Sequence, residues 1–95
     1  MTAAQRAPIL IFARERYCPD VARTRRRLKE LGIPWSERDV EADETAAAEM
    51  RKLTGRGSVP TVLIGDRVLV EPSNRELDVA LEAGGYMTSV PGRPS

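Results

Sequence analysis

The segment best equipped for chemistry is residues 17–21, Tyr-Cys-Pro-Asp-Val, because it holds the only cysteine of the chain. The chain has no histidine, so the commonest general base of enzymes is missing. Mechanisms that need a Ser-His or Cys-His pair within this chain are therefore excluded, and a single cysteine excludes an internal disulfide. Any nucleophilic chemistry of the chain is expected to take place at Cys18.

Cys18 is expected where a buried strand gives way to a helix. Residues 8–13 form a short apolar run of the kind found in strands that are covered on both faces. Apolar residues then recur at helical spacing until Gly32, which predicts a helix over about residues 19–31. Cys18 takes the N-cap position of this helix and Pro19 the first helical position, where a missing N–H costs nothing.

The start of this helix has opposing electrostatic effects on Cys18. The free N–H groups of the first turn and the positive end of the helix dipole favour a thiolate over a thiol. Asp20 brings a carboxylate into the same turn, and Arg14 and Arg16 could offset its charge. The alternative is that Cys18 is a small buried hydrophobe without a chemical role.

The composition describes one small domain with nearly balanced charge. The 95 residues carry 15 basic and 14 acidic side chains, so the net charge of +1 demands neither a nucleic-acid surface nor an acidic partner. No apolar run is long enough to span a membrane, and residues 1–7 lack the regions of a signal peptide. We therefore expect a cytoplasmic protein whose domain covers residues 8–86, with flexible termini at 1–7 and 87–95.

Beyond the first helix, the sequence predicts a strand, a helix, a hairpin and a last helix. These elements are a strand over 35–40, a helix from the Asp43 cap to about 54, strands over 59–64 and 67–70, and a helix from the Ser73 cap to about 83. Gly65-Asp66 is a tight turn between the hairpin strands, and a capping box begins at Ser73. The middle helix is expected to turn three apolar residues inward, namely Ala46, Met50 and Leu53.

Three segments of the sequence resemble the glutaredoxins, a family with the thioredoxin fold. They are Tyr17-Cys18-Pro19, Val59-Pro60-Thr61, and the hairpin followed by a capped helix. The element order β-α-β-α-β-β-α agrees with the α/β, thioredoxin-like fold that the resemblance implies, a four-stranded mixed sheet of order 2-1-3-4 flanked by three helices. The resemblance also implies that the Val59-Pro60 bond is cis and lies against Cys18, and that the Val59 backbone pairs with the peptide-like part of a bound thiol.

The resemblance implies that Cys18 is the catalytic nucleophile of a thiol–disulfide oxidoreductase. Dithiol members of the family have the motif Cys-Pro-Tyr-Cys, and Val21 stands where their second cysteine lies. The implied activity is therefore monothiol exchange by a monomer, whose partners are a small thiol and thiolated proteins. The implied thiol-binding residues are Arg16, Tyr17, Arg56, Val59, Pro60, Ser73 and Asn74.

The identity of the small thiol depends on the segment before the last helix. Pro72-Ser73 replaces the two glycines that are usual in glutaredoxins and is more similar to the mycothiol-dependent mycoredoxins of actinobacteria. Arg75 stands where the glutathione enzymes often have an acid that meets the substrate's ammonium group. The co-substrate is glutathione or an alternative such as mycothiol, and we predict weak glutathione binding and better activity with a sugar-based thiol.

Two other functions remain open. One is a redox-inert interaction module that keeps the fold without the chemistry. The other is a [2Fe-2S] carrier in which two protomers each supply Cys18 beside two small thiols. The motif associated with such clusters is Cys-Gly-Phe-Ser, which Pro19-Asp20-Val21 does not match, so we expect no metal.

The first helix also carries a cluster of cations. The expected explanation is a solvated face opposite the apolar stripe, and the alternative is the steering of anionic thiols. The cations are Arg23, Arg25, Arg26, Arg27 and Lys29.

Overall fold

The computed structural model describes residues 7–55, 57 and 59–86. The elements follow in the order β1 (Ile9–Ala13), α1 (Pro19–Glu30), β2 (Ser36–Asp39), α2 (Glu44–Thr54), β3 (Thr61–Ile64), β4 (Arg67–Val70) and α3 (Asn74–Ala83). β1 pairs in parallel with β2 and antiparallel with β3, and β3 pairs antiparallel with β4. The predicted element order and the predicted sheet order 2-1-3-4 are confirmed.

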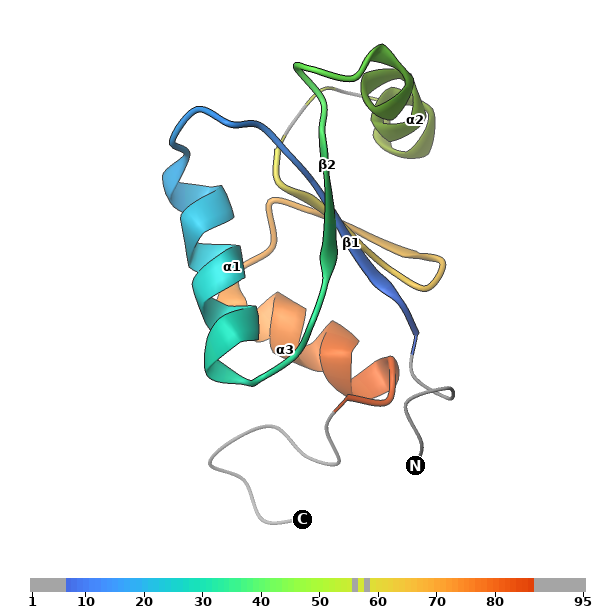
Figure 1. Ribbon diagram of the computed structural model, residues 1–95. Coiled ribbons are helices and arrows are strands. Elements are labelled where there is room, and N and C mark those ends of the chain that lie inside the picture. The colour runs from blue at the N-terminus through green and yellow to red at the C-terminus, as the bar shows by residue number, and fades with distance from the viewer. Residues whose placement is uncertain (1–6, 56, 58, 87–95) are drawn as a thin grey trace, which may run out of the picture.

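The helices cover both faces of the sheet. α1 and α3 contact each other on one face, and α2 lies on the other side of the strands (Figure 1). β1 is a central strand, and its Ile11 and Phe12 side chains are fully buried. This burial is the reason for the continuous apolar run that precedes the cysteine segment.

The helices begin and end near the predicted residues, where hydrogen bonds between neighbouring residues cap them. Asp43 caps α2, and Gly55 ends it in the left-handed conformation with φ 76°. Gly32, which follows α1, has φ 69°. Ser73 and Glu76 form the predicted capping box of α3, in which each side chain accepts the backbone N–H of the other residue.

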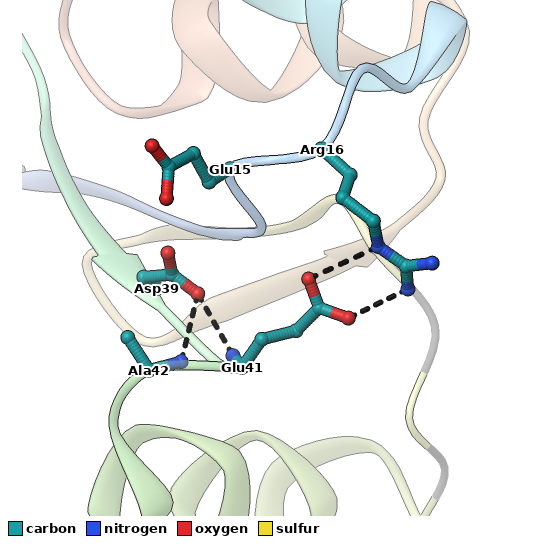
Figure 2. Close-up of a pocket in the computed structure, with 5 residues that line it drawn as sticks. All are labelled: Glu15, Arg16, Asp39, Glu41 and Ala42. Carbon is teal, nitrogen blue, oxygen red and sulfur yellow. Dashed lines mark hydrogen bonds and ion pairs between the residues drawn. The ribbon is translucent and has the colours of Figure 1, made fainter.

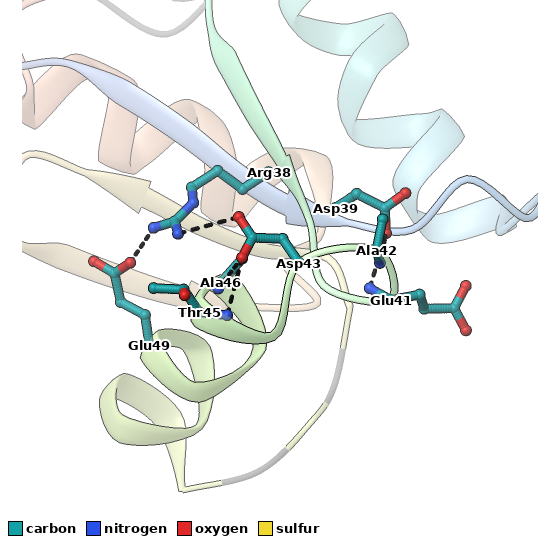
Figure 3. A network of polar contacts seen from close by, with 8 residues as sticks. All are labelled: Arg38, Asp39, Glu41, Ala42, Asp43, Thr45, Ala46 and Glu49. Atoms are coloured by element: carbon teal, nitrogen blue, oxygen red, sulfur yellow. Dashed lines mark hydrogen bonds and ion pairs between the residues drawn. The ribbon is translucent and has the colours of Figure 1, made fainter.

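Arg38 on β2 connects the sheet to the start of α2. Its guanidinium forms an ion pair with Glu49 and lies 3.5 Å from the Asp43 carboxylate (Figure 3). Asp39 beside it accepts the backbone N–H groups of residues 41 and 42 at 2.8 and 3.1 Å, which closes the turn between β2 and α2. The network therefore holds α2 against the edge of the sheet.

Two predicted strands are longer than the observed ones. β2 covers residues 36–39 rather than 35–40, because its parallel pairing with β1 begins at Ser36 opposite Leu10. β3 begins at Thr61 rather than at residue 59, because Pro60 has no N–H to donate to the sheet.

The prediction that Leu53 is buried was wrong. Ala46 and Met50 are buried as predicted, whereas Leu53 is 41% exposed. Leu53 has the helical spacing of the buried residues but lies in the last turn of α2. The core that buries Ala46 and Met50 therefore leaves much of the Leu53 side chain uncovered.

The two ends of the described domain meet. The Ala7 N–H donates to the Gly84 carbonyl at 3.1 Å, and the Tyr86 hydroxyl donates to the Ala7 carbonyl. Residues 1–6 and 87–95, which the sequence predicts to be flexible, lie outside the described residues. None of the helices in the described part of the chain has the length and the apolar character needed to cross a membrane.

Candidate functional site

Cys18 is the N-cap residue of α1, as predicted, and Pro19 is the first helical residue. Its backbone is extended, with φ −139° and ψ 119°, and its carbonyl accepts the Ala22 N–H at 2.9 Å. Its half-buried side chain makes no capping hydrogen bond with the described residues. The N–H groups of the first helical turn are thus not occupied by this side chain, and they can stabilise negative charge beside it.

Cys18 opens into a groove of about 500 Å³, the Cys18 groove. Three segments form it: the connection from β1 into α1, the segment before β3, and the residue after β4. Besides Cys18 and Pro19, the side chains that matter for its chemistry are those of Arg14, Arg16, Tyr17, Asp20, Val59 and Glu71. Tyr17 is 83% exposed and forms part of the open side of the groove.

Val59 lines the Cys18 groove, and both Val59 and the Pro60 that follows it are buried. The Val59-Pro60 peptide bond is cis, as predicted. Val59 makes no backbone-to-backbone hydrogen bond with the other described residues. The pairing of the Val59 backbone with a bound thiol stays a prediction.

Glu71 was not predicted as a site residue. It lines the Cys18 groove, and its N–H donates to the Pro60 carbonyl at 2.8 Å. It has φ 48°, an uncommon conformation for a residue other than glycine. The predicted hairpin could have identified it, because the register that pairs Thr61 with Val70 places Glu71 opposite Pro60 at the next position.

The positive charge of Arg16 is partly neutralised by a nearby carboxylate. Its side chain crosses to the loop after β2 and donates to Glu41, with Nη2 2.6 Å from one carboxylate oxygen (Figure 2). Hydrogen bonding to Glu41 raises the pKa of Arg16, and the negative charge of Glu41 adds to this effect. Because Glu41 already balances the charge of Arg16, this arginine contributes less to offsetting Asp20 than the sequence suggests.

Asp20 is paired with a residue on its own helix. Arg23 Nη1 lies 3.0 Å from its carboxylate, so part of the negative charge beside Cys18 is balanced by Arg23. Arg14 also lines the groove, and its buried Nε has no hydrogen-bond partner among the described residues. Arg14 is thus the cation of the described groove that is most available to a ligand.

Arg25 interacts electrostatically with Cys18. Hydrogen bonding to Glu37 raises the pKa of Arg25, burial opposes the shift, and the negative charges of Glu37 and of the Cys18 thiolate add to it. Arg25 lies on α1 two turns from its start, outside the groove itself. Glu37 therefore holds this cation outside the Cys18 groove.

The structure brings together part of the predicted site. The predicted residues Arg16, Tyr17, Cys18 and Val59 line one groove, and Pro60 is buried directly after Val59. Ser73 and Asn74 do not line it, and the hydroxyl and N–H of Ser73 are both engaged with Glu76. Arg56 lies outside the described residues.

The described residues contain no cluster of three or more cysteine, aspartate or glutamate side chains arranged to hold a metal ion. The arrangement instead resembles a binding groove with one nucleophile. A half-buried thiol lies at a helix N-terminus, and Val59 lines the same groove.

Residues 9–69 match the family model described as Glutaredoxin. No curated protein sequence matches the chain. The match includes the cysteine segment, the Val59-Pro60 segment and most of the hairpin.

Solved structures with the same fold include three informative ones. A mutant of the thioredoxin-like protein BC3987 is 26% identical with a TM-score of 0.71, over 78% of this chain and 94% of that one. Glutaredoxin grx-1 from Archaeoglobus fulgidus is 22% identical with a TM-score of 0.69, over 78% and 85% of the two chains. A buckwheat glutaredoxin in complex with glutathione is 20% identical with a TM-score of 0.65, over 85% and 82%. These likenesses confirm the thioredoxin-like fold.

Proposed function

Because the chain belongs to the glutaredoxin family, we propose that it is a monothiol thiol–disulfide oxidoreductase that reduces mixed disulfides between proteins and a low-molecular-weight thiol. The family supports thiol–disulfide exchange in general. The observation that carries the monothiol form is the position of Cys18, the only cysteine, at the start of α1 in a groove shared with Val59.

The first step is attack by the Cys18 thiolate on the small-thiol sulfur of the mixed disulfide. A bond forms between Cys18 Sγ and that sulfur, the disulfide bond of the substrate breaks, and the protein leaves as a thiolate that takes a proton from solvent. The first-turn N–H groups of α1 lie where they can stabilise negative charge on the attacking sulfur.

The second step restores Cys18. A thiolate of the same small thiol attacks the small-thiol sulfur bound to Cys18, which releases the Cys18 thiolate and the disulfide of the small thiol. The disulfide bond thereby passes from the protein to a pair of small thiols. A thiol from solution is needed because Val21, where dithiol relatives have a cysteine, is an apolar residue buried in the core.

The small thiol is proposed to be a sugar-based one, such as mycothiol, in preference to glutathione. The four charged residues of the described groove cancel, with Arg14 and Arg16 against Asp20 and Glu71. The start of α3 lacks two donors that a ligand could use, because Pro72 has no N–H and the Ser73 N–H donates to Glu76. A neutral thiol therefore suits the groove better than glutathione, whose two carboxylates and one ammonium group leave a net negative charge.

The experiment measures the release of a peptide from its mixed disulfide with a small thiol. The small thiol is glutathione in one series and mycothiol in the other, and the same thiol serves as the reductant. Wild type should turn over, and Cys18→Ser should fall to the uncatalysed background because the nucleophile is lost. The matched control is the double variant Cys18→Ser/Ser36→Cys, which moves the single thiol to an exposed position on β2. It should also be inactive, because a thiol alone does not supply the site.

Three outcomes would overturn the proposal. The double variant could match wild type, which would mean that no special site is needed. Wild type could be inactive with every thiol, as expected for a redox-inert module. Anaerobic reconstitution with iron and sulfide could give a stable chromophore that depends on Cys18 without exchange activity, as expected for a cluster carrier.

A further inference from the structure

A second groove lies along the outer side of α1, beginning one helical turn beyond Cys18. It has a volume of about 490 Å³ and is lined by Ala22, Arg25, Arg26, Lys29 and Trp35. The four helix residues recur at spacings of three and four, so they form one stripe on the helix surface. Trp35 comes from the segment before the edge strand β2. This α1 groove shares no lining residue with the Cys18 groove.

The α1 groove combines apolar surface with positive charge. Ala22 and Trp35 are half-buried and supply the apolar part. Trp35 Nε1 donates to Glu37 at 2.8 Å, and Arg25 donates to the same carboxylate through two nitrogens at 2.7 Å. One carboxylate thus fixes both Trp35 and Arg25, and the shape of the groove does not depend on a ligand.

The free positive charge of α1 is concentrated at this groove. Arg23 is paired with Asp20, and Arg27 is paired with Asp78. Arg26 and Lys29 are exposed and form no ion pair with the described residues. Two unpaired cations thus lie in a concave surface beside a tryptophan that Glu37 holds in place.

We propose that the α1 groove binds an acidic segment of the thiolated protein substrate, close in sequence to the modified cysteine. An apolar side chain of that segment packs on Trp35 and Ala22, and its flanking carboxylates pair with Arg26 and Lys29. This inference rests on the proposed function and names the class of protein on which it acts.

The position of the groove limits where the acidic residues lie. Ala22 is four residues and Lys29 eleven residues beyond Cys18. At a rise of about 1.5 Å per residue, the groove extends from about 6 to about 17 Å along the helix. An extended peptide covers this distance with about two to five residues. The acidic segment therefore lies within about five positions of the modified cysteine.

A peptide fits this surface better than a nucleic acid. Nucleic-acid binding gains its affinity from many phosphate contacts, about 6 to 10 in typical cases. The α1 groove offers two unpaired cations, and the whole chain has a net charge of +1. Two or three carboxylates around one apolar residue match both its charge and its apolar surface.

Binding can be measured directly because Trp35 is the only tryptophan of the chain. The full-length Cys18→Ser variant, which cannot exchange thiols, is titrated with a synthetic peptide of about ten residues that has a central Leu between Glu residues. The fluorescence emission of Trp35 should change and reach a plateau as the peptide is added. The same peptide with Gln in place of Glu should bind at least about tenfold more weakly. Raising the salt concentration from about 0.05 to about 0.5 M should weaken the binding of the Glu peptide but not that of the Gln peptide.

Charge reversal tests which residues bind the peptide. Arg26→Glu/Lys29→Glu, made in the Cys18→Ser protein, should remove binding of the Glu peptide. The matched control is Arg51→Glu/Lys52→Glu, which makes the same charge change on exposed residues of α2 and should keep it. Circular dichroism checks that both variants are folded. Equal weakening by both pairs, or tighter binding of a single-stranded oligonucleotide than of the Glu peptide, would overturn the proposal.

Turnover separates this proposal from the proposed function. With Cys18 intact, Arg26→Glu/Lys29→Glu should lower kcat/KM about tenfold for a mixed-disulfide peptide with Glu flanks. It should change kcat/KM by less than about twofold for a small disulfide that cannot reach the groove. Inactivity of wild type toward both substrates would contradict the exchange function, whereas the fluorescence titration would still decide the groove. Equal loss on both substrates would contradict the groove alone.

Discussion

Arg27 on α1 and Asp78 on α3 form a two-point ion pair, in which Nε and Nη2 donate to the two carboxylate oxygens at 2.9 and 2.7 Å. The two side chains are 20% and 10% exposed. The pair joins two helices on the same face of the sheet (Figure 1), and α1 is the helix that begins at Cys18. It therefore helps to fix the helix that positions the nucleophile.

Removing Asp78 should destabilise the fold. Asp78→Ala should lower the free energy of unfolding by about 1–3 kcal/mol, because it leaves a mostly buried guanidinium without its partner. The matched control is Glu30→Ala, since Glu30 is 58% exposed and lies 3.8 Å from the same arginine. That change should stay within about 0.5 kcal/mol. Urea unfolding measures both values, and equal losses would contradict the argument.

Two apolar residues of α2 should respond very differently to truncation. Met50 is 2% exposed and Leu53 is 41% exposed. Met50→Ala should cost about 2–5 kcal/mol through lost burial and the cavity left behind. Leu53→Ala should cost less than about 1 kcal/mol, because much of its side chain already contacts water. If Leu53→Ala lowered the free energy of unfolding as much as Met50→Ala, the last turn of α2 would have to be buried, which would contradict this prediction.

Stability should decrease on acidification. Hydrogen bonding to Arg25 lowers the pKa of Glu37, the Ala46 N–H lowers that of Asp43, and the Ser73 N–H lowers that of Glu76. Each group binds its proton more weakly in the folded than in the unfolded state, so its contribution is present above its unfolded pKa of about 4. That contribution is lost as the pH falls through the lowered, folded pKa.

Glu37→Gln isolates one of these contributions. Urea unfolding between about pH 3 and pH 7 should give a shallower loss of stability for Glu37→Gln than for wild type, because one of the shifted groups is gone. An unchanged slope, or a wild-type stability that rises on acidification, would contradict the assigned directions.

Glu71 should influence the choice of small thiol. Glu71→Gln removes one negative charge from the Cys18 groove, and a unit charge at about 6 Å in a water-like medium is worth about 0.7 kcal/mol. Its kcat/KM with glutathione should therefore rise about threefold, while the value with mycothiol changes little. Glu15→Gln is the matched control, because Glu15 is exposed and lies outside this groove. A fall with glutathione would mean that Glu71 instead binds its ammonium group.

The sequence by itself determined the features that depend on neighbouring residues. The cap at Asp43 and the capping box at Ser73 were predicted because their hydrogen bonds close within a few residues. The strand before Cys18 was predicted from its continuous apolar run, which reflects burial on both faces of the sheet. The sheet order was predicted both from the element order and from the resemblance to glutaredoxins, and it is confirmed. The resemblance alone added the cis bond before Pro60, which is also confirmed.

Only the tertiary structure decided which distant groups meet. The pairing of Arg16 with Glu41 and that of Arg27 with Asp78 join residues far apart in the chain. Both depend on how packed elements are oriented, which periodicity does not specify. The same orientation excludes Ser73 from the Cys18 groove and admits Glu71. The number of cations on α1 follows from the sequence. Which of them are neutralised depends on the fold, because ion pairs form only where packing brings opposite charges within a few ångströms.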